Sequence, residues 1–172
     1  GFIDRFVTAG FQVITFDNRD QGLSTEFDWE PPTQTRAVLA TLVKRPPKAG
    51  YLITDMANDA IGLLDALGIE EAHVVGMSMG GMIVQTMAIE HPERLRSVTS
   101  IMSTTGDQSV GQASPEAMGA LLAPPAEGRE AMIAQGIEGS KAIAGPLWNR
   151  EVAAIRTAAS YDRSFYPQGA AF

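Results

Sequence analysis

An α/β fold with a parallel sheet is predicted by three features of this 172-residue chain. Short apolar runs rich in β-forming residues, such as "AHVVGM", are typical of buried strands. Amphipathic segments with clear ends, such as "TDMANDAIGLLDALG", are typical of helices. The two kinds alternate at a spacing that suits right-handed crossovers, and crossovers of this kind join parallel strands.

The first helix and the first strand are expected within the first 17 residues. The stretch "FIDRFVTAG" gathers apolar side chains on one helical face and ends at Gly10. The run "FQVITFD" predicts a strand over residues 12–16, followed by the loop "NRDQGLST". Residues 26–50 are polar and proline-rich, which predicts a long surface loop with one helical turn near "TRAVLATLV". The apolar face of the first helix consists of Phe2, Ile3, Phe6 and Val7.

The clearest helix is "TDMANDAIGLLDALG". Thr54 or Asp55 is expected to cap its start, and Gly68 to end it. The strand at residues 72–77 shows no polar alternation, so it is expected to be buried on both faces. The helix "GGMIVQTMAIEH" follows, and the strand "LRSVTSIMS" comes after it. The apolar face of the clearest helix consists of Met56, Ala60, Leu63, Leu64 and Leu67.

The chain divides into two parts by composition. Residues 1–103 read as the central part of an α/β core that lacks its N-terminal portion, because the chain opens inside a helix without an initiator methionine. Residues 104–172 are rich in Ala, Gly, Pro and Met and predict three or four short helices and no strand. We expect this second part to be a helical cap over one end of the sheet, with the rest of the core missing after it.

Composition excludes several classes of function. The net charge of −7 and the absence of a basic stripe argue against a nucleic-acid-binding protein. The chain has no cysteine, which excludes disulfides and thiolate metal sites. No apolar stretch is long enough to span a membrane, and no secretory signal is present at the start. A cytoplasmic protein without a cofactor is therefore expected.

The stretch Gly76-Met77-Ser78-Met79-Gly80 matches the pattern G-x-S-x-G between a predicted strand and a predicted helix. We call residues 76–80 the serine turn. In this context Ser78 is expected to stand on a strained turn as a nucleophile, and the Met79 amide is expected to donate to an oxyanion. The alternative is that the turn only joins a strand to a helix. The stretch is not a phosphate-binding loop, because no lysine follows the glycines. It is not a dinucleotide-binding fingerprint either, because Ser78 stands where that motif needs a glycine.

The stretches "GFQVITFDNRDQGLST", "DMANDAIGLLDALGIEEAHVVGMSMGGMIVQTMAIEHPERLRSVTSIMSTTG" and "YDRSFYPQG" extend over most of the chain. Together they resemble the α/β-hydrolase superfamily, and within it the esterase branch that includes aclacinomycin methylesterase. The resemblance implies a cofactor-free Ser-His-Asp hydrolase of carboxylic esters, with Ser78 as nucleophile and the Met79 N–H in the oxyanion hole. Asp17, Arg19 and Gly22 match a loop of the family that we expect to be structural, with the carboxylate and guanidinium tying its turn together.

The residue that would activate Ser78 is not found in this chain. His73 stands five residues back along an extended strand, about 16 Å away, and His91 lies about 16 Å along the following helix. The resemblance implies that the triad acid and histidine come after the cap. It also implies that a third strand lies between strands 12–16 and 72–77. Alone, this chain is therefore expected to be an incomplete domain and inactive.

The predicted substrate is a small, uncharged and hydrophobic ester, because the cap region is apolar. Met77 and Met79 flank the nucleophile, so Met77 is a candidate substrate contact, and Met82 and Met87 are expected in the core. Two alternatives stay open. One is a non-catalytic protein that keeps the turn as architecture and binds a small ligand or a partner. The other is haloperoxidase or lactonase chemistry of the same superfamily.

Overall fold

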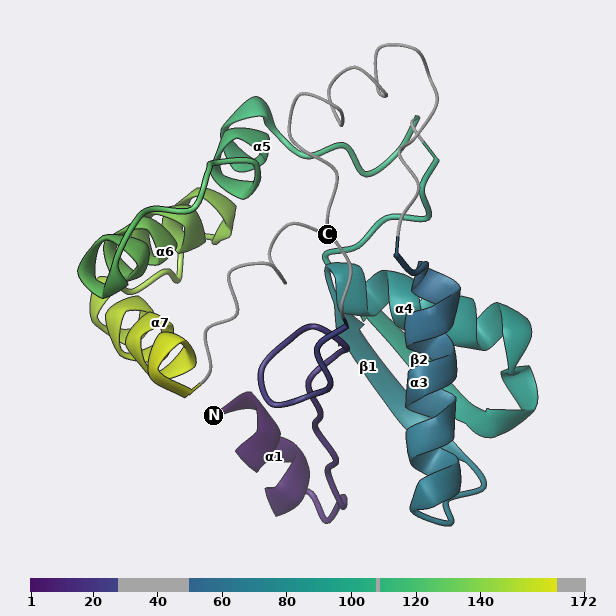
Figure 1. Ribbon diagram of the computed structural model, residues 1–172. Helices are drawn as coiled ribbons and strands as arrows, with labels where there is room; N and C mark the ends of the chain where they lie inside the picture. The colour runs from purple at the N-terminus through teal and green to yellow at the C-terminus, as the bar shows by residue number, and fades with distance from the viewer. Residues whose placement is uncertain (28–49, 108, 164–172) are drawn as a thin grey trace.

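The computed structural model describes residues 1–27, 50–107 and 109–163 (Figure 1). Three layers follow one another in it: an N-terminal helix with a loop, a small α/β core, and a group of three C-terminal helices. The elements are α1 (Phe2–Thr8), α3 (Ile53–Ala66), β1 (Ala72–Met77), α4 (Met79–Glu90), the 3₁₀ turn η1 (Pro92–Arg94), β2 (Leu95–Ile101), α5 (Pro115–Leu121), α6 (Arg129–Ile143) and α7 (Arg150–Arg163).

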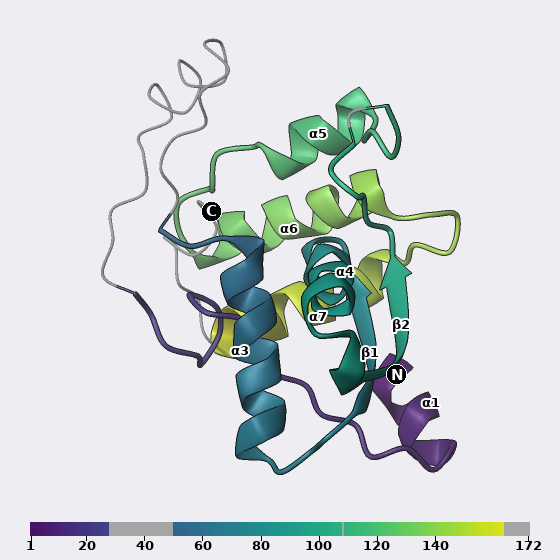
Figure 2. The ribbon, with the colours of Figure 1, turned by 90° about the vertical axis from the view of Figure 1, so that its right-hand side faces the viewer.

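Strands β1 and β2 form a parallel pair, joined by α4 as the crossover helix. Helices α3 and α4 pack against each other, and α4 packs against both strands, so the helices cover one face of the pair (Figures 1 and 2). This is the strand–helix–strand arrangement that the sequence predicts. The core between these elements consists of Met56, Ala57, Ala60, Ile61, Leu64, Ile83, Val84 and Met87.

The prediction that residues 72–77 are buried on both faces is wrong for this structure. Burial alternates along β1: Val74 and Gly76 point to the helices, whereas Val75 is 43% and Met77 62% exposed. The cause is that only one face of the strand pair is covered by helices among the described residues. The uncovered face keeps apolar side chains that a second layer could bury.

The predicted strand at residues 12–16 does not form. These residues are extended, but no strand pairs with them within the described residues, and no hydrogen bond joins them to β1. A strand exists only with a hydrogen-bonded neighbour, so the β-forming sequence alone is not sufficient. A strand between residues 12–16 and residues 72–77 therefore stays a prediction of the resemblance.

Helix α3 begins differently from the prediction. Its N-cap is Leu52, while Thr54 lies inside the first turn. Asp55 still serves the helix start, because its carboxylate accepts the Leu52 N–H at 2.7 Å. Gly68 follows the helix with φ +66°, as expected for the residue that ends a helix. Leu67, expected on the apolar face, is 51% exposed.

Helix α1 ends before Gly10, which has φ +91°, as predicted. Much of its predicted apolar face stays exposed in this structure, with Phe2 59% and Val7 56% accessible. The predicted loop over residues 18–25 is present. The predicted loop over residues 26–50 and its helical turn lie almost entirely outside the described residues.

The C-terminal helical layer, α5–α7, forms by itself a packed group. Helix α6 packs against both α5 and α7, and Gly136 allows a close approach to Thr157 across the α6–α7 contact. Over the described part of residues 104–163 the prediction of short helices without a strand is confirmed. Among the described residues, no helix combines the length and the apolar character that crossing a membrane requires.

Candidate active site

The serine turn places Ser78 at the carboxyl end of β1, directly before the first residue of α4. Ser78 has φ 54° and ψ −120°, a backbone conformation that costs a non-glycine residue about 1–3 kcal/mol. Its N–H donates to the Ile101 carbonyl at 2.9 Å, which extends the β1–β2 ladder one step beyond the strand. The strained turn is thus held by β2 as well as by its own strand.

Gly76 is sterically required in the serine turn. A Cβ at this position would overlap the Gly80 carbonyl group, where α4 turns back over the strand. A Cβ at Gly80, by contrast, would meet no described atom within 4 Å. Close packing therefore requires glycine at position 76. Gly80 takes part in the contact only through its backbone carbonyl group, so a side chain at position 80 would fit. Gly81 is also tight, since a Cβ there would lie 2.5 Å from the Ser103 Cβ.

The start of α4 provides the electrostatics that the prediction requires. The Gly81 and Met82 N–H groups donate back to the Ser78 carbonyl at 2.9 and 3.3 Å. Met79 is the first residue of the helix, where a backbone N–H has no carbonyl one turn earlier to bind. Together with the positive end of the helix dipole, this amide can stabilise negative charge beside Ser78. The side chains of Ser78, Met77 and Met79 are all exposed.

Neither histidine accompanies Ser78. The His73 Nδ1 lies 2.7 Å from the Ser97 Oγ, and its ring packs edge-on against Phe11. The His91 Nε2 lies 2.9 Å from the Asn58 Oδ1, and His91 caps the end of α4. Both rings are committed to structural contacts away from the serine turn, as the sequence distances predict.

The loop over residues 17–27 is organised around two aspartates. The Asp17 carboxylate accepts the Leu23 N–H at 3.0 Å, and the Asp17 carbonyl accepts the Ser24 hydroxyl at 2.6 Å. A Cβ at Gly22 would overlap the Asp17 carboxyl group, and Gly22 has φ +57°. Asp17 therefore fixes the turn, as expected for a structural loop.

Arg19 has a different role from the one predicted. Its guanidinium leaves the loop and binds Asp59 on α3 through two hydrogen bonds of 2.6 and 2.7 Å. It also lies over the rings of Phe27 and Tyr51, at 5.0 and 5.1 Å from their centroids. The hydrogen bonds that Arg19 donates to Asp59 raise the pKa of Arg19 above its ordinary value. Arg19 thus fastens the loop to the core instead of closing the turn.

Asp20 is completely buried within the same loop. Its φ is 57°, and its Oδ1 accepts the Phe27 N–H at 2.6 Å. Its Oδ2 has no partner among the described residues. The sequence did not mark this residue as buried, because an aspartate in a polar loop is normally exposed.

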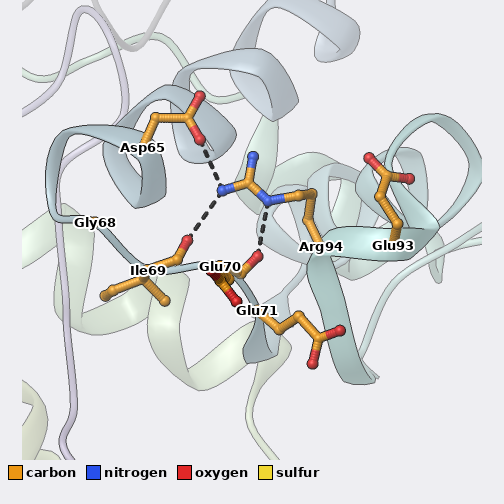
Figure 3. Close-up of a pocket in the computed structure, with 7 residues that line it drawn as sticks. All are labelled: Asp65, Gly68, Ile69, Glu70, Glu71, Glu93 and Arg94. Carbon is orange, nitrogen blue, oxygen red and sulfur yellow. Dashed lines mark hydrogen bonds and ion pairs between the residues drawn. The ribbon is translucent and has the colours of Figure 1, made fainter.

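The opposite end of the strands carries a shallow hollow of about 600 Å³ (Figure 3). Arg94 crosses it, donating to the Glu70 and Ile69 carbonyls at 2.8 and 3.0 Å and pairing with Asp65 at 2.7 Å. The hollow lies at the amino ends of β1 and β2, whereas Ser78 lies beyond the carboxyl end of β1. It is therefore separate from the serine turn. No group of three or more His, Asp or Glu side chains in the described ranges is placed to share a metal ion.

The chain matches the family model of the α/β hydrolase fold over residues 2–166. It is 36% identical over 101 residues to rhodomycin D methylesterase DauP of Streptomyces sp. strain C5, which covers 59% of this chain and 28% of that protein. It is 33% identical over 108 residues to 2-hydroxymuconate semialdehyde hydrolase of Pseudomonas sp. strain CF600, covering 57% of this chain and 38% of that protein. The matched regions thus span well under half of these relatives.

A solved structure supports the same fold. The esterase RhEst1 from Rhodococcus sp. ECU1013 is similar with a TM-score of 0.54 at 22% identity, covering 78% of this chain and 56% of that one. The family model covers nearly the whole chain, and Ser78 stands between a parallel strand and its crossover helix as the G-x-S-x-G pattern requires. The chain belongs to the α/β-hydrolase fold family.

Proposed function

We propose that the whole protein carrying this chain is a serine hydrolase of carboxylic esters, with Ser78 as its nucleophile. The observation that supports this most directly is the backbone of Ser78, which is held at positive φ on a turn between β1 and α4. Strain of this kind in a serine, with its side chain exposed, is the geometry of a nucleophile presented to a substrate. The names of the matched relatives, a methylesterase and another hydrolase, support the same class.

The proposed reaction uses three groups around the ester carbonyl. A general base removes the Ser78 proton as the hydroxyl oxygen attacks the carbonyl carbon. The Met79 N–H donates to the oxygen as it becomes negative, and the positive end of α4 adds to this stabilisation. The alcohol leaves with a proton, and water then releases the acid from the acyl-serine. We propose that the base is a histidine of the whole protein other than His73 and His91, since both of these have other partners.

The proposed substrate is an uncharged, hydrophobic ester. Met77 and Met79 flank the nucleophile with exposed apolar side chains, and pliable thioethers suit apolar groups of varied shape. We propose further that the C-terminal helical layer is the cap of this active site, with residues 1–103 as part of the core and residues 104–172 as the cap region.

The experiment that tests this function is replacement of the nucleophile in the whole protein. Ser78→Ala is expected to reduce the hydrolysis of p-nitrophenyl esters by about 10⁴-fold or more, since the acyl-enzyme cannot form. A fluorophosphonate probe is expected to label the unaltered protein on Ser78. Ser97→Ala is the matched control, because this serine lies on β2 beside His73, away from the serine turn.

The alternatives give different results in the same experiment. Hydrolysis that persists in Ser78→Ala would remove Ser78 as the nucleophile. Absence of both probe labelling and turnover of any ester would instead favour the non-catalytic binding protein, since Ser78 would then not be an activated nucleophile. A panel that adds lactones and carbamates to the methyl and p-nitrophenyl esters would identify lactonase or carbamate chemistry, each of which would depend on Ser78 in the same way.

A further inference from the structure

An ion pair joins two parts of the chain that lie 146 residues apart. The Arg163 guanidinium donates to both oxygens of the Asp17 carboxylate, with N–O distances of 3.0 and 2.6 Å. Arg163 is the last residue of α7, and Asp17 begins the loop of residues 17–27. In Figure 1 the yellow end of α7 faces this purple loop across the space between helical layer and core.

The Asp17 side of the pair is prearranged by the core. The Leu23 N–H and the close approach of Gly22 already hold its carboxylate. The same loop is fastened to α3 by the two hydrogen bonds between Arg19 and Asp59. Because the Asp17 carboxylate is already held in place, it loses little conformational entropy when Arg163 binds it. The ion pair can therefore contribute more of its interaction energy to docking.

The Arg163 side belongs to the helical layer. The other ion pairs among the described residues of this layer stay within it: Arg129 on α6 binds Asp162 on α7, and Arg150 binds Glu138. The Arg129–Asp162 pair is also bidentate, with N–O distances of 2.6 and 2.5 Å. Its Asp162 directly precedes Arg163 in the sequence. The Asp17–Arg163 pair therefore differs from its neighbours in linking the layer to the core.

We propose that Asp17 and Arg163 are positioning residues that dock the C-terminal helical layer on the core, and that this docking sets the affinity for bulky ester substrates. The proposal rests on the proposed esterase function. In this proposal a bulky acyl group bound at Ser78 extends to the helical layer, so that its binding depends on where the layer lies. A short acyl group is expected to make its contacts at the serine turn alone. The pair touches no reacting atom and is not expected to change the chemical step.

The test compares Arg163→Gln and Asp17→Asn with the unaltered whole protein. For a p-nitrophenyl ester with a long acyl chain, we expect KM to rise about threefold to tenfold while kcat changes little, as for loss of one partly exposed charge pair. For p-nitrophenyl acetate, both constants are expected to stay unchanged. Amide hydrogen exchange in α6 and α7 is expected to become faster in both variants. Arg163→Lys keeps the positive charge but cannot donate to both carboxylate oxygens in the same way. It should therefore show a smaller rise in KM than Arg163→Gln.

Arg129→Gln is the matched control, because it removes a bidentate pair of the same kind that lies wholly inside the layer. An unchanged KM for the long ester in Arg163→Gln would overturn the proposal. An equal rise in Arg129→Gln would also overturn it, since general loosening of the layer would then be the cause. Hydrogen exchange needs no substrate, so it tests the docking even where the esterase function fails, and Ser78→Ala tests the esterase function independently of Arg163.

Discussion

Ser78 and Gly76 show how one turn determines the backbone geometry at the candidate active site. The serine takes a strained backbone conformation, and the glycine two residues earlier removes the side chain that would collide with α4. The pentapeptide together with its flanking strand and helix was sufficient to predict this arrangement, because all of these parts lie within a few residues of sequence. It was not sufficient to show that Gly76 and Gly80 have unequal roles. That difference depends on where the Gly80 carbonyl points, which the sequence does not state.

Substitution of the two glycines gives a direct test of this inequality. Gly76→Ala is expected to lower the free energy of unfolding by about 1–3 kcal/mol, because the new methyl group forces α4 away from β1. Gly80→Ala is expected to change it by less than about 0.5 kcal/mol, since its methyl group meets open space and alanine favours a helix. Denaturant titration of both variants checks this. Equal losses in the two would contradict the steric account.

The elements were predicted well where local sequence decides them and poorly where a distant neighbour does. Helices α3 and α4 and strands β1 and β2 follow from periodicity and flanking glycines. Residues 12–16 have the composition of a strand but no neighbour to pair with, and β1 is covered on one face only. The role of Arg163 could not be predicted either, since nothing in the sequence around Asp17 points to a residue 146 positions later.

The link between the 17–27 loop and α7 predicts a response to acid. The hydrogen bonds from Arg163, and then the Leu23 N–H, hold the pKa of Asp17 below its ordinary value of 3.8. A carboxylate whose pKa is lowered by folding stabilises the folded state above that ordinary value, and this contribution disappears as the pH falls through the lowered pKa. Since both side chains are partly exposed, we expect a contribution of about 0.5–1 kcal/mol at pH 6.

The measurement is the free energy of unfolding of Asp17→Asn and of the unaltered protein at pH 6 and at pH 3 or below. The two curves are expected to differ at pH 6 and to converge in acid. Arg163→Gln should give the same loss at pH 6, and the double variant should lose little more than either single one. A difference that grows as the pH falls would have the wrong sign for this ion pair.

At the scale of the whole molecule, apolar surface is unevenly distributed. The α3–α4 face of the strand pair is packed, while apolar side chains of α1, of the extended 11–16 segment and of the far face of β1 remain exposed. Single exposed apolar residues are common, but large side chains exposed on three neighbouring segments suit a surface that another layer covers. The family resemblance predicts such a layer through a missing strand, and the exposed face is the physical reason to expect one.

A chain of these 172 residues on its own is therefore expected to bind an apolar dye and to self-associate. Dye fluorescence and light scattering at increasing concentration measure the two effects. Val75→Thr combined with Met77→Gln should reduce both without loss of helical circular dichroism, because these side chains lie on the uncovered face of β1. A monodisperse chain that does not increase the dye fluorescence would show that the exposed face of β1 is covered in solution.

The two ends of the strand pair are each tied by a contact outside the strands. At one end Arg94 holds the carbonyls of Ile69 and Glu70, and at the other the Ser78 N–H binds the Ile101 carbonyl. These two contacts limit which changes of length the connection between α4 and β2 can accept. An inserted or deleted residue that slid β2 by one position would move the Ile101 carbonyl by about 3.3 Å and release the backbone of Ser78. Tags or inserted domains are therefore better placed elsewhere than between residues 91 and 95, although that turn lies at the surface and far from the serine.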